Sequence, residues 1–167
     1  MGLLKNLLTQ LLFEGNMFVT NFFSENKNFK ISNKKEIRAL FKKICKKENK
    51  KISFINCVFC SDNRLLEINK KYLKHTSLTD VITFDFTSNK KNIEGDIYIS
   101  TDRVKENAKK YNETFNVELL RVIIHGLLHL IGFSDKTKED KNTMTLKENE
   151  YLSLYNKLTF HVEHKQQ

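Results

Sequence analysis

The segment from residue 115 to residue 133 places the strongest constraint on the fold. It reads Phe-Asn-Val-Glu-Leu-Leu-Arg-Val-Ile-Ile-His-Gly-Leu-Leu-His-Leu-Ile-Gly-Phe, and its last twelve residues contain no Asp, Glu, Lys or Arg. A helix that is apolar almost all round is stable only inside a protein. The sequence therefore predicts a helix at 115–131 that is buried at the centre of the fold.

Short β-rich segments and amphipathic helical segments alternate along the rest of the chain. Strands are expected at 18–23, 51–59, 80–86 and 95–100, where β-branched and aromatic residues concentrate. Further helices are expected at 34–47, from Ser61 or Asp62 onward, at 101–111 and at 138–154. Asn33 followed by Glu36 is typical of a helix start. The order βαβαββααα predicts a single α/β (α+β) domain in which about five helices pack on a mixed four-stranded sheet.

Both ends of the chain are expected to lie outside this domain. Six leucines recur at helical spacing within residues 1–16, which predicts an amphipathic extension that docks loosely or is dispensable. This apolar stretch is much shorter than the about 20 residues of a transmembrane helix, and no signal-peptide cleavage site follows it. We expect the domain to span residues 17–157 and a flexible tail to occupy 158–167, without membrane attachment.

The positive charge of the chain is concentrated in one part of it. Residues 27–51 contain eleven Lys or Arg and two Glu, a balance of +9 that equals the formal net charge of the whole chain. Such a local field favours a polyanion, either nucleic acid or an anionic membrane surface. The alternative is a face whose lysines only keep the protein in solution. The lysines of helix 34–47, among them Lys35, Lys42 and Lys46, are expected to face outward.

The three cysteines indicate a reducing compartment and a role in core packing. Three thiols in a chain of this size do not make a disulfide framework, so the cytoplasm is the simpler setting. Cys57 and Cys60 form a C-x-x-C motif, but they lie on a predicted strand. Residues three apart on a strand point to opposite faces, so this pair is expected to pack in the core rather than to hold a metal.

Two histidines on the central helix carry the chemical signal. His125 and His129 are four residues apart, so their imidazoles project from the same helix face, close enough to share a metal ion. Gly132 can end the helix in a left-handed conformation and let Asp135 turn back toward them. Two ligands on a helix and one after it leave an open position for water, as a catalytic zinc site requires. The alternative is that both histidines are hydrogen-bonded residues of the core.

A missing carboxylate narrows the reaction type. Zinc proteases with an H-E-x-x-H motif place a glutamate directly after the first histidine as general base. Here that position is Gly126. The motif therefore favours a metal-assisted hydrolase other than this type of peptidase.

Three sequence blocks are similar to one bacterial family. His125-Gly-Leu-Leu-His-Leu-Ile-Gly-Phe-Ser-Asp135 resembles the YbeY signature H-G-x-L-H-L-x-G-Y-D-H. Asn69-Lys-Lys-Tyr72 with Leu78-Thr-Asp-Val-Ile-Thr-Phe84 resembles the N-x-x-Y-R and P-T-D-V-L-S-F block, and Gly95-Asp-Ile-Tyr-Ile-Ser100 resembles G-D-I-x-I-S. The resemblance keeps the family's order and spacing and runs from about residue 17 into the 150s.

The resemblance implies a zinc-dependent, single-strand-specific endoribonuclease. It implies a role in the cytoplasm in rRNA maturation, at the 3′ end of the small-subunit rRNA, and in ribosome quality control, with rRNA and the small ribosomal subunit as partners. One Zn²⁺ would be held by His125, His129 and Asp135, and helix 34–47 would hold the phosphate backbone without reading bases. The general base is unassigned, with Glu94 and Asp96 as candidates.

The chain departs from the family pattern at three positions. The third histidine of the signature is Asp135 here, and carboxylate oxygen is an acceptable zinc ligand. The arginine that follows the family's tyrosine is Leu73, so its role cannot be carried over to this residue. Lys74 and His75 are neighbouring donors that could contact the substrate instead, unless this loop is simply solvated. Leu78 replaces a proline.

Two other functions fit the same residues. One is a zincin-like metallopeptidase, whose ligands can also follow an H-x-x-x-H pattern with a later Asp. The other is a non-catalytic ribosome-associated protein in which the metal only stabilises the fold. The absent glutamate and the basic charge argue against the first, and a loss of RNA cleavage with retained rRNA binding would identify the second.

Overall fold

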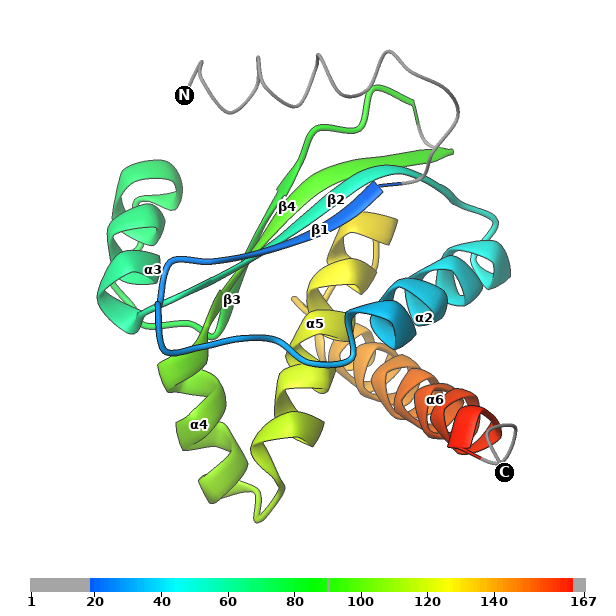
Figure 1. Ribbon diagram of the computed structural model, residues 1–167. Coiled ribbons are helices and arrows are strands. Elements are labelled where there is room, and N and C mark those ends of the chain that lie inside the picture. The colour runs from blue at the N-terminus through cyan, green and yellow to red at the C-terminus, as the bar shows by residue number, and fades with distance from the viewer. Residues whose placement is uncertain (1–18, 90, 164–167) are drawn as a thin grey trace.

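Four strands form one mixed sheet in the order β1-β2-β4-β3 (Figure 1). The computed structural model describes residues 19–89 and 91–163. β1 (Val19–Ser24), β2 (Lys51–Cys60) and β4 (Asn92–Ser100) run parallel to one another, and β3 (Val81–Asp85) pairs antiparallel with β4. This arrangement confirms the predicted mixed four-stranded sheet.

Five α-helices of the described residues surround the sheet unevenly. They are α2 (Lys34–Lys47), α3 (Asp62–Ile68), α4 (Thr101–Lys110), α5 (Phe115–Ile131) and α6 (Lys138–Glu163), and the π-helical turn η1 (Asn69–Leu73) continues α3. Figure 1 shows α2, α5 and α6 below the sheet and α3 beyond its other side. The element order confirms the predicted single α/β domain.

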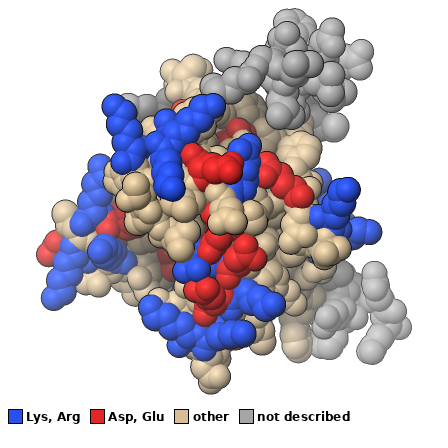
Figure 2. Space-filling model, turned by 90° about the vertical axis from the view of Figure 1, so that its left-hand side faces the viewer, with Lys and Arg blue, Asp and Glu red and all other residues tan. Residues whose placement is uncertain are grey.

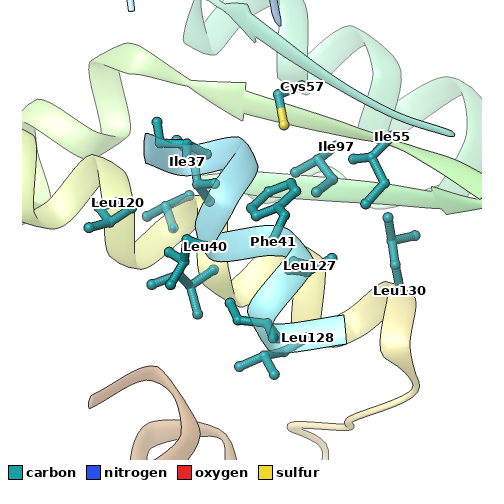
Figure 3. Packing of buried hydrophobic residues seen from close by; sticks show 14 of the residues in the cluster. Ile37, Leu40, Phe41, Ile55, Cys57, Ile97, Leu120, Leu127, Leu128 and Leu130 are labelled. Atoms are coloured by element: carbon teal, nitrogen blue, oxygen red, sulfur yellow. The ribbon is translucent and has the colours of Figure 1, made fainter. Parts of the chain in front are cut away.

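The main core lies between the sheet and helices α2, α5 and α6. Phe41 of α2 and Leu127 of α5 are fully buried and lie together beneath Ile97 of β4 (Figure 3). α5 has the bounds predicted for it, and its buried residues occur on almost every side of the helix, which confirms its central position. A smaller apolar cluster under α3 covers the opposite face of the sheet with Leu65, Ile68 and Ile82.

One local expectation is confirmed and one is wrong. α2 begins directly after Asn33, as predicted, although Asn33 has φ 54° and its side chain makes no capping hydrogen bond to the helix. α6 continues to Glu163, beyond the predicted end at residue 154, because Tyr155 and Leu158 still pack against the core. Residues 1–16 lie outside the described residues, so the amphipathic extension and its role stay predictions, as do the domain limits at 17–157 and 158–167.

The cysteines are free and buried, as predicted. Cys57 faces the main core, whereas Cys60 belongs to the cluster on the other face of the sheet, so the C-x-x-C pair does not converge. Burial raises the pKa of both thiols and keeps them protonated. No single helix within residues 19–89 and 91–163 is long and apolar enough to cross a membrane.

Surface charge differs between faces. On the face formed by α3 and α4, acidic side chains gather centrally among lysines and arginines (Figure 2). Ion pairs such as Arg103–Asp62 and Arg64–Glu67 mix the two signs there. On α2, by contrast, Lys35, Lys42 and Lys46 are all exposed, which confirms that the basic stripe of this helix faces outward.

Candidate metal centre

Helix α5 is held unusually close to the sheet by a glycine. Thr114 caps its first turn by accepting a hydrogen bond from the Val117 amide. Farther along, a Cβ atom on Gly126 would lie 2.5 Å from Ile97 Cγ2 of β4, so only glycine permits this approach. The glycine in the motif therefore has a packing role, and it fixes which side of α5 faces the sheet.

His125 and His129 lie side by side on the other flank of α5. Their ring centroids are 4.5 Å apart, and the two Nε2 atoms are 2.9 Å apart. About a quarter of each side chain is exposed, so the pair is reachable from solvent, although most of the neighbouring residues of the helix are buried. The predicted juxtaposition of the two imidazoles is present.

The Nδ1 atom of each imidazole ring faces a hydrogen-bond acceptor. His125 donates its Nδ1 hydrogen to Glu148 Oε1 at 2.7 Å, and His129 donates its Nδ1 hydrogen to the Phe133 carbonyl at 3.1 Å. With the hydrogen on Nδ1, each neutral imidazole carries a lone pair on Nε2. The two Nε2 atoms therefore converge on one point, and this arrangement is suited to a shared cation.

Asp135 completes a group of three. Gly132 adopts φ 114° and ends α5, and its amide donates to the carbonyls of Leu128 and His129. The chain then turns and brings Asp135 Oδ2 to 3.9 Å from the Nε2 atoms of both histidines. The three ligand atoms lie within 4.8 Å of one another, and the group could hold a metal ion.

The separations suit a small cation after slight adjustment. Zn²⁺ binds imidazole nitrogen at about 2.0–2.1 Å, so two tetrahedral nitrogens lie about 3.3 Å apart, and a carboxylate oxygen lies at a similar distance from each. The Nε2 atoms must separate by a few tenths of an ångström and Asp135 must approach by about half an ångström. Asp135 is 44% exposed and stands in a loop, so it can move more easily than the helical histidines.

The surroundings shift the pKa values of the two imidazoles in opposite directions. Burial alone would lower the pKa of His125, but the hydrogen bond and charge of Glu148 outweigh it, and the net pKa is raised. The pKa of His129 is lowered by burial and by its neighbour His125. Glu148 therefore draws positive charge toward His125, which also favours a bound cation.

The predicted substrate residues divide between two places. His75 lines a hollow of about 320 Å³ together with His129, Asn69 and Leu73, so it lies beside the candidate metal group. Lys74 is the exposed residue between Leu73 and His75, with φ 57°. Lys35, Lys42 and Lys46 lie on α2.

The two candidate general bases, Glu94 and Asp96, do not lie beside the candidate metal ligands. Asp96 accepts a hydrogen bond from Asn56 at 2.8 Å within the sheet, whereas its neighbour Gly95 faces Leu130 of α5. Side chains alternate along a strand, so Asp96 and Glu94 lie on the face of the sheet away from α5. Neither is positioned to take a proton beside His125 and His129.

Sequence reasoning missed Glu148 and Arg121. Glu148 lies on α6 and is only 8% exposed, and its second oxygen accepts from Arg121 Nη1 at 3.2 Å. A signal was available, because Glu148 shares a helix face with Met144 and Tyr151, both buried. A carboxylate within an apolar stripe needs a buried partner.

The fold and the candidate centre together define a class of protein. It is a small α/β protein with two histidines on a buried helix and a carboxylate just after it, the kind of three-ligand group that catalytic metal sites use. The family described as Endoribonuclease YbeY matches residues 21–156, and the chain belongs to this family. It is accordingly an endoribonuclease, a hydrolase that cleaves RNA.

Individual relatives agree over most of the chain. Endoribonuclease YbeY of Christiangramia forsetii is 46% identical over 143 residues, which cover 86% of this chain and 95% of the relative. The Cytophaga hutchinsonii protein of the same name is 47% identical over 133 residues, or 80% and 93% of the two chains. A solution structure of a Thermotoga maritima protein is 29% identical, with a TM-score of 0.57, over 81% of this chain and 88% of that one.

Proposed function

We propose that the chain is a zinc-dependent endoribonuclease whose metal ligands are His125, His129 and Asp135. The observation that carries this proposal is the convergence of the two Nε2 atoms, 2.9 Å apart, while Glu148 and the Phe133 carbonyl face both Nδ1 atoms as acceptors. Zn²⁺ held by these residues would supply a Lewis acid and would make a water molecule available as a nucleophile near neutral pH.

The protein's own residues have distinct roles in this scheme. Glu148 and the Phe133 carbonyl fix the ring orientations, so that both Nε2 atoms stay aimed at one point. His75 lines the hollow that includes His129 and can donate a hydrogen bond to a phosphate oxygen there, with Lys74 next to it. The lysines of α2, including Lys35, Lys42 and Lys46, attract the backbone of the RNA without selecting bases.

The proposed substrate is single-stranded RNA, and its cellular source is rRNA. We propose that the protein acts in the cytoplasm, on the 3′ end of small-subunit rRNA and in ribosome quality control, in contact with the small subunit. The basic stripe on α2 supports a large polyanionic partner. Three buried, free cysteines are compatible with a reducing compartment.

The test compares RNA and protein substrates with and without a chelator. Purified wild type is incubated with single-stranded RNA, structured rRNA and casein, and the chelated sample is re-supplied with Zn²⁺. We expect chelator-sensitive cleavage of RNA and none of casein, and loss of cleavage in His129→Ala. Casein cleavage would identify a peptidase, and inertness with tight rRNA binding would identify a non-catalytic ribosome-associated protein.

The third ligand needs its own variants. Asp135→Ala is expected to weaken Zn²⁺ binding by at least tenfold, whereas Asp135→His, which restores the ligand of the family signature, is expected to retain it. Glu150→Ala provides a control, because this carboxylate on α6 pairs with Lys47 and Lys147 rather than with an imidazole. Unchanged zinc affinity in Asp135→Ala would show that another group is the third ligand.

A further inference from the structure

A second hollow, separate from the one beside His129, is lined mainly by lysines. It has a volume of about 610 Å³ and lies where α2 ends, where β2 begins and just before β4. The residues that line it are Lys42, Cys45, Lys46, Asn49, Lys50, Lys51, Ile52 and Lys91. Five of these eight side chains are cationic, and the two apolar ones, Cys45 and Ile52, are buried.

The backbone brings these lysines together from distant parts of the chain. Lys42 and Lys46 are one helical turn apart on α2 and share a face. Asn49 adopts φ 54° and reverses the chain after α2, and the Lys50 amide donates to the Cys45 carbonyl at 2.7 Å. The Lys51 amide donates to the Lys91 carbonyl at 2.8 Å, which places the β3–β4 connection beside the start of β2.

Four of the five lysines that line this hollow have no carboxylate partner among the described residues. Among the described residues, Lys42, Lys46, Lys51 and Lys91 form no ion pair with a carboxylate. Nearby acidic groups are engaged elsewhere, since Glu48 binds Lys147 and Tyr151, and Glu150 binds Lys47 and Lys147. Clustered like charges repel one another and attract a polyanion.

We propose that this hollow binds the phosphate backbone of single-stranded RNA, as a second contact apart from the metal centre. The inference rests on RNA being the substrate. None of the described residues that line the hollow is aromatic, so bases have no surface on which to stack. Recognition of phosphates alone is independent of sequence and strongly dependent on salt. A membrane fits the site less well, because its apolar residues are buried and unavailable to lipid.

The hollow lies at the end of the sheet toward which α5 points. Gly126 faces Ile97, and Leu130 lies against Gly95, so α5 runs antiparallel to β4 and finishes near the start of this strand. Lys91 immediately precedes β4. Figure 1 shows α5 ending beneath the sheet and α2 ending beside the loop that leads to the start of β2. The basic hollow thus lies toward the C-terminal end of α5, the helix that carries His129.

The experiment compares two lysine pairs on the same helix. Lys42→Ala/Lys46→Ala removes two charges from the hollow, whereas Lys34→Ala/Lys35→Ala removes the same charge from the first turn of α2, outside it. All four side chains are exposed, so neither double variant disturbs the core. Binding of a fluorescent 20-nucleotide single-stranded RNA is measured by anisotropy between 50 and 300 mM salt, with EDTA present to prevent cleavage.

We expect the hollow variant to lose much more affinity than the Lys34/Lys35 variant, which removes only part of the general attraction that α2 exerts on RNA. Loss of two phosphate contacts to single-stranded RNA makes the plot of log binding constant against log salt concentration less steep by about 1.4. This change corresponds to about 25-fold weaker binding at 0.1 M salt. With Zn²⁺ present, this variant should raise the KM for the long RNA and leave cleavage of a dinucleotide unchanged. An equal loss in both double variants would overturn the proposal and leave only a diffuse attraction by α2.

Further outcomes separate this inference from the proposed function. If wild type cleaves no RNA but the hollow variant alone loses binding, the nuclease mechanism fails and the RNA contact stands. If His129-dependent cleavage is present and neither pair affects binding or KM, the mechanism stands and the hollow is refuted. Loss of binding to anionic lipid vesicles, with RNA binding unchanged, would also refute it and assign the hollow to a membrane surface.

Discussion

Glu148 should control metal affinity without touching the metal. Its carboxylate is 8% exposed, with one oxygen 2.7 Å from His125 Nδ1 and the other 3.2 Å from Arg121 Nη1. Glu148→Ala removes the carboxylate that accepts the Nδ1 hydrogen of His125. The ring can then move its hydrogen to Nε2, which consumes the lone pair needed for a metal.

The loss of Zn²⁺ affinity expected in Glu148 variants can be given a magnitude. Loss of a carboxylate behind a metal-bound histidine typically weakens metal binding by about 10- to 100-fold, or about 1.4–2.7 kcal/mol. Because this contact is short and largely shielded from water, Glu148→Ala should fall in the upper part of that range. Glu148→Gln keeps an acceptor oxygen and loses only the charge, so it should lie in the lower part.

The assay is Zn²⁺ competition with a chromophoric chelator, run beside thermal unfolding of the metal-free proteins. Arg121 retains its hydrogen bond to Asn149 at 2.9 Å, so the variant should still fold. Glu150→Ala, two residues along the same helix, serves as control and should bind zinc like wild type. If folded Glu148→Ala binds Zn²⁺ within twofold of wild type, the argument from ring orientation is wrong.

Three further predictions address packing, a buried charge and the missing arginine. Gly126→Ala should lower the free energy of unfolding by about 1–3 kcal/mol, because its Cβ would lie 2.5 Å from Ile97 Cγ2; an unchanged urea midpoint would contradict this. Burial raises the pKa of Asp96 above the ordinary value of 3.8, so folding disfavours the ionised form of this side chain. The free energy of unfolding therefore falls as the pH rises from 3.8 to the raised pKa. Asp96→Asn, which can still accept from Asn56, should therefore raise the melting temperature at pH 7 and not below pH 3.8; equal effects at both pH values would exclude this cause. Leu73→Arg places a cation in the hollow shared with His129 and should lower the KM for RNA, with Leu78→Arg as an exposed control outside that hollow.

Local sequence signals predicted the centre of the fold well. The apolar run that forms α5 lies between a capping residue, Thr114, and a glycine that can take positive φ, so both ends are specified by neighbouring residues. The pairing of His125 with His129 follows from helix geometry alone. These features needed no knowledge of how distant segments pack.

Contacts between distant segments were not predictable in the same way. Glu148 reaches His125 across 23 positions only because α6 packs against α5, a packing that no local pattern specifies. Lys51 and Lys91 meet through pairing of the segments at the starts of β2 and β4. The sequence showed a charged helix, whereas the structure shows that Lys42 and Lys46 share a hollow with lysines from two other segments and that Lys35 does not.

Gly126 connects the packing of the fold to the type of reaction. In sequence, its presence meant only that the glutamate of a zinc protease was missing. In the structure, a Cβ atom at this position would lie 2.5 Å from Ile97 Cγ2 and 3.3 Å from Val81 Cγ2 of the sheet. A glutamate there would bring this Cβ atom into Ile97 and would force α5 away from β4. The close packing of α5 on β4 is thus incompatible with a base at this position, and any proton acceptor must come from another element or from the RNA.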